Sequence, residues 1–172
     1  MPRHLILFRH AKSEWPAGVA DYDRPLSARG RNDAPAMARW LAGEGYPPSL
    51  ALVSTARRTQ ETWRLASAEL GPVPRQDEAS IYEAPTARLL DLVRATEPPV
   101  MTLLVLGHNP GMEDLASLLM RDDGGEAGTR LRTKFPTAGI AVLSLPVEDW
   151  QDAAPHTAAL ERFATPKTIT EP

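Results

Sequence analysis

The chain has 172 residues, no cysteine and a formal net charge of −3, which predicts one domain that buries roughly 70% of its unfolded surface without a disulfide or structural metal. The lack of cysteine excludes disulfides and thiolate metal sites, and the acidic balance gives no general attraction to nucleic acid or anionic membranes. Its apolar runs are shorter than the ~20 residues of a membrane span.

The first predicted element is a buried strand over residues 3–9, and because it begins almost at Met1, we expect no signal peptide and a cytoplasmic location. A polar loop over 10–26 leads to a helix that Ser27 caps and that extends to about residue 41. The elements expected next are a strand at 50–54, a helix at 57–70, a short strand near 80–82, a helix at 86–96, a strand at 100–106, a helix at 110–120, a mobile loop at 121–135, a strand at 139–145 and an edge strand near 160–163.

This order of elements predicts the fold class. Strands that alternate with helices favour an α/β fold in three layers, α/β/α, around a mostly parallel sheet. The last strands follow one another without an obvious helix, so we expect an antiparallel edge. We expect residues 1–164 to form the single domain and residues 165–172, rich in proline and threonine, to form a loose tail.

Two of the four histidines occupy equivalent places in this pattern. His10 follows the first strand, and His108 follows the strand at 100–106. Open α/β sheets place their ligand crevices at the carboxyl ends of the strands. Two histidines there, with Arg9 beside one of them, predict a site that holds an anion and attacks it.

Three motifs resemble those of the histidine phosphatase superfamily, in that family's order and spacing. They are Arg9-His10, the run Ser54–Thr62 with serine, arginine and threonine at four-residue intervals, and Gly107-His108-Asn109. Asp23–Gly30, Ile81–Ala84 and Pro136–Gly139 are further similar to its small branch of SixA-like phosphohistidine phosphatases. The resemblance extends to about residue 145. It implies a phosphoglycerate-mutase-like fold and a phosphatase that needs no cofactor.

The resemblance also implies catalytic roles. His10 is the expected nucleophile, which takes up the phosphoryl group and so splits one difficult displacement into two easier ones. Arg9 and Arg58 are expected to clamp the phosphoryl oxygens through bidentate, permanently charged contacts. The motif spacing favours Arg58 over its neighbour Arg57. His108, when protonated, is expected to neutralise charge that develops in the transition state.

Four further residues have less specific signals. Lys12 and Ser13 adjoin the nucleophile and are candidate phosphate contacts. Asn109 is expected to cap the helix that follows it, beside the bound anion. Glu83 falls where larger relatives carry the general acid that protonates the leaving group, and a surface carboxylate near a helix start is the alternative interpretation.

The expected substrate is phosphohistidine on a protein carrier. Pro16 stands where larger relatives that handle sugar phosphates often carry asparagine, and their long insertions are missing. The alternatives are a phosphomonoesterase for small phosphate esters and a phosphate-binding module without activity. The sequence shows no metal-ligand constellation and no stacking platform for nucleic acid, and we expect a monomer.

Overall fold

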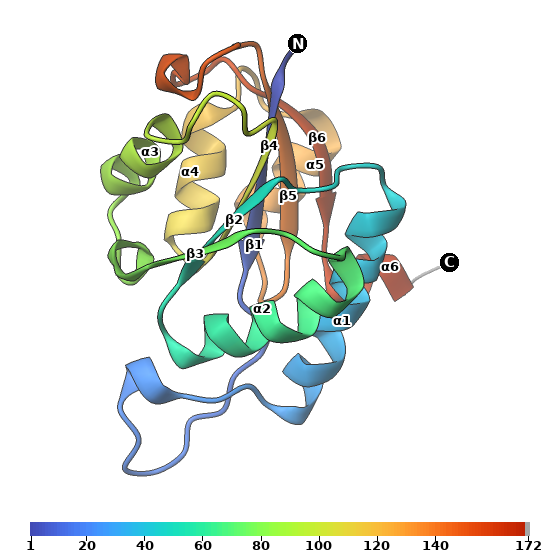
Figure 1. Cartoon of the computed structure of the whole chain (residues 1–172). Coiled ribbons are helices and arrows are strands. Elements are labelled where there is room, and N and C mark those ends of the chain that lie inside the picture. Colours follow the sequence, from blue (N-terminus) through green and yellow to red (C-terminus); the bar gives the residue numbers. More distant parts are fainter. Residues whose placement is uncertain (171–172) are drawn as a thin grey trace.

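The computed structural model describes residues 1–170. Its strands form one six-stranded mixed sheet in the order β3-β2-β4-β1-β5-β6 (Figure 1). The strands are β1 (Arg3–Arg9), β2 (Leu50–Ser54), β3 (Arg75–Glu78), β4 (Thr102–Gly107), β5 (Ile140–Leu145) and β6 (Ala159–Ala164). The first four are mutually parallel, whereas β5 is antiparallel to both β1 and β6. The predicted α/β fold, with its parallel sheet and antiparallel edge, is confirmed.

Helices cover both faces of this sheet (Figure 1). One face packs against α1 (Ala28–Gly43), α2 (Arg57–Leu70) and α6 (Pro166–Thr170), and the other against α3 (Thr86–Arg94), α4 (Gly111–Leu119) and α5 (Gly125–Thr133). No helix among residues 1–170 is long and apolar enough to cross a membrane.

The central strand β1 shows why the sheet is buried on both sides. Successive side chains point to opposite faces of a strand, so Leu5 and Leu7 join the core under α3–α5, while Ile6 and Phe8 join the core under α1 and α2. All four are completely buried. Truncation of such a leucine to alanine costs about 2–5 kcal/mol of folding stability. This strand therefore anchors Arg9 and His10 at its end.

The first turn of α1 lies against the loop that follows β1. As predicted, Ser27 caps this helix: the Gly30 amide donates to its side-chain oxygen at 3.1 Å. A Cβ atom on Gly30 would lie 2.1 Å from the carbonyl oxygen of Lys12. Because only glycine permits this approach, α1 can hold the loop that carries the nucleophile candidate.

Three sequence-based expectations on local structure are wrong. The short strand expected near 80–82 is a turn of 3-10 helix, η2 (Ala79–Ile81), and the edge strand β3 lies before it. The loop expected at 121–135 contains α5, whose Leu131 is fully buried. The tail expected to be loose includes the short helix α6, whose Ile169 packs against the core under α1. Residues 171–172 of that tail lie outside the described residues.

Candidate active site

The carboxyl ends of β1 and β4 bring the two histidines together. Arg9 pairs with Gly107 in the parallel ladder, and the His10 amide donates to the Gly107 carbonyl at 3.0 Å. The next residues along each strand are therefore neighbours. The ring centroids of His10 and His108 lie 5.3 Å apart, as the sequence pattern predicts.

The main chain fixes the tautomer of His10. Its Nδ1 lies 2.8 Å from the carbonyl oxygen of Ala11, which can only accept a hydrogen bond, so Nδ1 carries the proton. The Nε2 atom keeps its lone pair and accepts from Arg58 Nε at 3.3 Å. Burial lowers the pKa of His10 well below its usual value, and the nearby cations lower it further. The ring is therefore neutral at pH 7 and nucleophilic at Nε2.

Arg9 lies beside His10 with part of its guanidinium uncompensated. Its Nη1 donates to the Phe135 carbonyl at 2.9 Å, while its Nε is buried without a partner. Burial lowers the pKa of Arg9, and the neighbouring Arg58 lowers it further. An anion bound between the two guanidinium groups would relieve this repulsion.

Asp21 positions Arg58, and sequence reasoning missed it. It lies on the 3-10 turn η1 (Asp21–Asp23). Arg58 donates from Nη1 to the Asp21 carbonyl at 2.7 Å and from Nη2 to the Asp21 carboxylate at 3.1 Å. The Tyr82 hydroxyl donates to the same carboxylate at 2.5 Å, and Arg24 donates to its other oxygen at 2.8 Å. These bonds, that from Tyr82 foremost, hold the pKa of the Asp21 carboxyl well below its usual range.

His108 is neutral at pH 7, because burial, together with the charge of Arg58, lowers its pKa to about 4. Its Nε2 lies 2.8 Å from the hydroxyl oxygen of Ser54, and its Nδ1 is buried without a partner. A bound anion stabilises the protonated form of an adjacent histidine, so the charge of His108 depends on occupancy.

The geometry explains the four-residue spacing of the second motif. Ser54 ends β2 and bonds His108, and Arg58 lies in the first turn of α2 against His10. One turn further on, the Thr62 hydroxyl accepts from the Ala11 amide at 3.0 Å and donates to the Arg58 carbonyl. Thr62 therefore holds the loop that follows His10. By contrast, Arg57 is exposed and pairs with Glu61 at 3.0 Å, away from His10.

These side chains line a pocket of about 250 Å³, which we call the histidine pocket. It contains most of the predicted site residues together with three that the sequence did not single out. Its lining consists of Arg9, His10, Lys12, Ser13, Trp15, Arg24, Arg58, His108, Asn109 and Thr137. Arg24 is held by a hydrogen bond to the hydroxyl of Ser13 and lies 3.2 Å from the ring centroid of Trp15.

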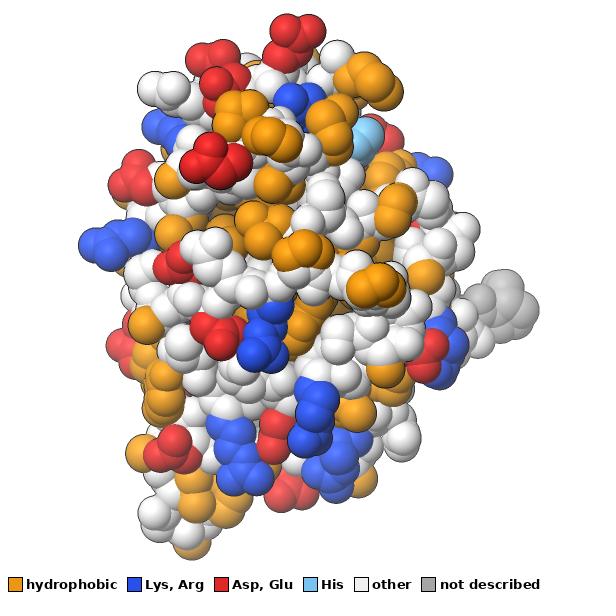
Figure 2. Space-filling view, viewed as in Figure 1, with side chains coloured by type: hydrophobic (Ala, Val, Ile, Leu, Met, Phe, Trp, Pro, Cys, Tyr) orange, Lys and Arg blue, Asp and Glu red, His pale blue; other side chains and the backbone are white. Residues whose placement is uncertain are grey.

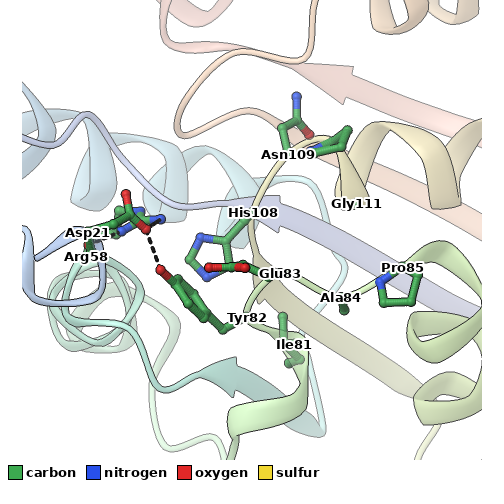
Figure 3. A pocket seen from close by; sticks show the side chains of 11 residues that line it. Asp21, Arg58, Ile81, Tyr82, Glu83, Ala84, Pro85, His108, Asn109 and Gly111 are labelled. Carbon is green, nitrogen blue, oxygen red and sulfur yellow. Dashed lines mark hydrogen bonds and ion pairs between the residues drawn. The ribbon is translucent and has the colours of Figure 1, made fainter.

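A wider and more apolar cavity of about 460 Å³, the outer pocket, adjoins the histidine pocket (Figure 3). Arg58, His108 and Asn109 line both. In Figure 3 the Tyr82 hydroxyl points at Asp21 on one side of His108, and Ala84 and Pro85 lie on the other side.

Glu83 lines the outer pocket and not the histidine pocket. Its φ of 57° is in the left-handed region, which costs an ordinary residue on the order of 1 kcal/mol and is concentrated at functional sites. The backbone thus holds the Glu83 carboxylate at the cavity that adjoins Arg58 and His108.

Asn109 lies one residue before the N-cap position of α4, which Pro110 occupies, but its side chain bonds an amide of the first turn, as expected of a capping residue. The same side chain also joins two segments. The Asn109 Oδ1 accepts from the Glu113 amide at 3.2 Å, and its Nδ2 donates to the Phe135 carbonyl at 2.9 Å. The carbonyl oxygen of Phe135 thus accepts hydrogen bonds from both Arg9 and Asn109.

The residues that sequence reasoning missed lie on irregular segments. Asp21, Arg24 and Trp15 belong to the loop after β1, and Tyr82 follows η2. Arg24 and Tyr82 fall within segments similar to the SixA-like branch, and that similarity was the available signal for them. Among residues 1–170, no three histidine, aspartate or glutamate side chains are grouped so that they could hold a metal ion.

Comparison with known proteins assigns the chain to a family. The model of the histidine phosphatase superfamily (branch 1) matches residues 5–89. An uncharacterized protein of Mycobacterium tuberculosis is 38% identical over 161 residues, which cover 92% of this chain and 99% of that protein. An uncharacterized chloroplastic protein of Arabidopsis thaliana is 32% identical, over 88% of this chain and 70% of its own length. The chain belongs to the histidine phosphatase superfamily, branch 1.

Solved structures agree with this assignment. The presumed phosphohistidine phosphatase SixA of Nakamurella multipartitia superposes with a TM-score of 0.86 at 30% identity, over 96% of this chain and 97% of that one. The presumed SixA of Agrobacterium tumefaciens gives a TM-score of 0.80, also at 30% identity, over 96% and 99% of the two chains. The fold is therefore the phosphoglycerate-mutase-like fold of the histidine phosphatases.

Proposed function

We propose that this protein is a phosphatase that removes phosphate from phosphohistidine on a protein, through an intermediate on His10. The observation that carries the proposal is the state of that imidazole. Its Nδ1–H is held by a carbonyl, and its Nε2 lone pair lies in a pocket with Arg9, Arg58 and His108. A buried, neutral nucleophile surrounded by cations suits attack on a phosphoryl group.

The first step transfers the phosphoryl group to His10. The Nε2 lone pair forms a bond to phosphorus while the bond between phosphorus and the leaving nitrogen breaks, and the electron pair of that bond stays on the leaving group. Arg9 and Arg58 bind the non-bridging oxygens and stabilise their charge. In the second step water attacks the phosphorus, which releases inorganic phosphate and returns the electron pair to Nε2.

The leaving group must gain a proton, and the outer pocket is where it would lie. Glu83 lines this pocket beside His108, so its carboxyl group is our candidate donor. An imidazole leaving group that already carries a proton departs without this help, whereas an alkoxide does not. The proposed role of Glu83 therefore depends on the leaving group.

An exposed approach to the site supports a protein substrate. Trp15 lines the histidine pocket and is 75% exposed, and Tyr22 on the same loop is 39% exposed. Large apolar side chains beside a reaction pocket provide contact area for a macromolecule. The two presumed SixA structures at 30% identity carry the same substrate class in their names.

The second candidate function is hydrolysis of small phosphate esters. The outer pocket favours it, because about 460 Å³ beside His108 is enough for a small organic leaving group. Both candidates use the same His10 chemistry and differ only in what leaves.

One experiment distinguishes the two candidates. Phosphohistidine-bearing carrier proteins and a panel of sugar phosphates are offered side by side at equal concentration, and release of inorganic phosphate is measured. We expect kcat/KM to be higher for the carriers by at least about tenfold. Preference for any sugar phosphate would overturn the phosphohistidine proposal, and no turnover of either class would indicate a binding module.

A further inference from the structure

A third cavity, next to the histidine pocket, is lined by basic residues. This basic pocket, of about 250 Å³, is lined by four cationic side chains and, among residues 1–170, by no acidic one. The cations come from separate parts of the chain: Arg29 from α1, Arg130 from α5, Lys134 from the end of α5, and Lys167 from α6. This local excess of cations contrasts with the net charge of −3 of the whole chain.

Two of these cations have no salt-bridge partner in the described part of the chain. Among residues 1–170, neither Arg130 nor Lys134 forms a salt bridge. Both side chains are exposed, and Arg130 lies 5.9 Å from the ring centroid of Phe163. On the face shown in Figure 2, basic side chains instead lie among acidic ones.

The segment from Lys134 to Ala138 connects the basic pocket to the reaction site. Lys134 lines the basic pocket, and the Phe135 carbonyl accepts a hydrogen bond from Arg9. Thr137 lines both the basic pocket and the histidine pocket. The Ala138 amide then donates to the His10 carbonyl at 2.9 Å. A group in the basic pocket therefore lies beside a phosphoryl group bound at His10.

We propose that the basic pocket binds acidic side chains of the protein substrate next to its phosphohistidine. This inference rests on the proposed function and specifies its substrate class. The lining suits carboxylates on alkyl stems, since cations stand around the apolar surface of Phe163, Pro136 and Pro166. Complementary charge of this kind raises the affinity for the correct partner and disfavours cationic ones.

Binding tests the proposal without turnover. Two phosphohistidine peptides, one flanked by glutamates and one by glutamines, are titrated against His10→Ala protein by fluorescence anisotropy. We expect the acidic peptide to bind about 3–10-fold more tightly at low salt, and this preference to vanish in about 0.5 M salt. It should also vanish in Arg130→Gln/Lys134→Gln on the same background.

The matched control is Arg121→Gln, an exposed arginine just beyond the far end of α4, which should leave the preference unchanged. Equal affinity for the two peptides, or a preference that survives in the double variant, would overturn the proposal. Loss of the preference in millimolar free glutamate at constant ionic strength would assign the pocket to a small carboxylate instead.

Turnover separates this proposal from the proposed function. With His10 intact, Arg130→Gln/Lys134→Gln should hydrolyse a chromogenic aryl phosphate within about twofold of the wild-type rate, because neither side chain contacts the histidine pocket. If the wild type hydrolyses the aryl ester but neither peptide, the phosphohistidine proposal fails. The binding preference still decides the role of the basic pocket.

Discussion

The histidine pocket and the outer pocket lie side by side but are built in different ways. In the first, His10 and Arg58 are buried and held by main-chain and side-chain bonds from three segments. The second is wider. Its Glu83 is exposed, has a backbone φ in the left-handed region, and comes after the 3-10 turn η2. In the proposed mechanism, the side that attacks is therefore held by more bonds than the side where the leaving group would lie.

The largest effect is expected from the nucleophile. His10→Ala removes the proposed nucleophile, so turnover should fall by about 10⁴–10⁶-fold. Both proteins are incubated with a radiolabelled substrate, and the reaction is then quenched without acid. The wild type should carry a base-stable, acid-labile phosphoryl label and the variant none. An unchanged amount of label in His10→Ala would place the intermediate elsewhere.

Removal of one arginine from the histidine pocket should lower turnover less than loss of the nucleophile does. Arg58→Ala deletes a charge-stabilising donor and should lower kcat by about 10²–10³-fold. Arg57→Ala is the matched control, because this neighbouring arginine is exposed and pairs with Glu61. Steady-state kinetics of both variants on one aryl phosphate measure the contrast. A dead Arg57→Ala beside an active Arg58→Ala would reverse the assignment.

The outer pocket should respond to the chemistry of the leaving group. Glu83→Gln removes a candidate proton donor, so hydrolysis of alkyl phosphates should slow by about 10²-fold. A nitrophenyl phosphate, whose leaving group needs no proton, should slow by less than about threefold. Rates for a series of esters with leaving groups of rising pKa test this difference. Equal, small effects on all esters would show that Glu83 is a surface carboxylate and not the proton donor.

The smallest expected effect is on stability, and it again arises from the buried side. Folding lowers the pKa of His108 to about 4, so the unfolded chain binds more protons below its own pKa near 6.5. Stability is therefore lost as the pH falls below 6.5, by roughly 1 kcal/mol from this residue between pH 6.5 and 5.5. Urea unfolding at both pH values measures this effect. Between pH 6.5 and 5.5, His108→Gln should lose less of its free energy of unfolding than the wild type does, by that same amount.

A matched control accompanies that measurement. His156 is exposed and lines neither the histidine pocket nor the outer pocket, so His156→Gln is the control for loss of a histidine away from the site. If His108→Gln and His156→Gln change the loss equally, the pKa of His108 is not lowered by folding.

The sequence predicted the parts of the molecule that hydrophobic patterning encodes. The strands β1, β2, β4 and β5 are runs of buried aliphatic residues, and they fixed the positions of Arg9, His10 and His108. The edge strand β3 was missed because its four residues, Arg-Gln-Asp-Glu, carry no apolar signal. Helix α5 was missed because charged and glycine residues outnumber its one large buried side chain, Leu131.

The positions of the candidate site residues could be predicted from the sequence, but the contacts that support them could not. Spacing favoured Arg58 over Arg57, and the structure places Arg58 against His10. The role of Asp21 could not be predicted, because its bonds to Arg58 and Tyr82 join residues 37 and 61 positions away in the sequence. Such contacts depend on loop geometry, for which a single sequence has no periodic signal.

The support that β5 and the segment before it give to His10 has a consequence for synthesis on the ribosome. The Phe135 carbonyl that holds Arg9 lies 126 residues after it in the sequence, and the Ala138 amide that holds the His10 carbonyl lies further on still. A nascent chain that has emerged only as far as β4 has both histidines but lacks these bonds. We therefore expect ribosome-bound chains to acquire hydrolytic activity late, only once β5 has left the exit tunnel and paired with β1.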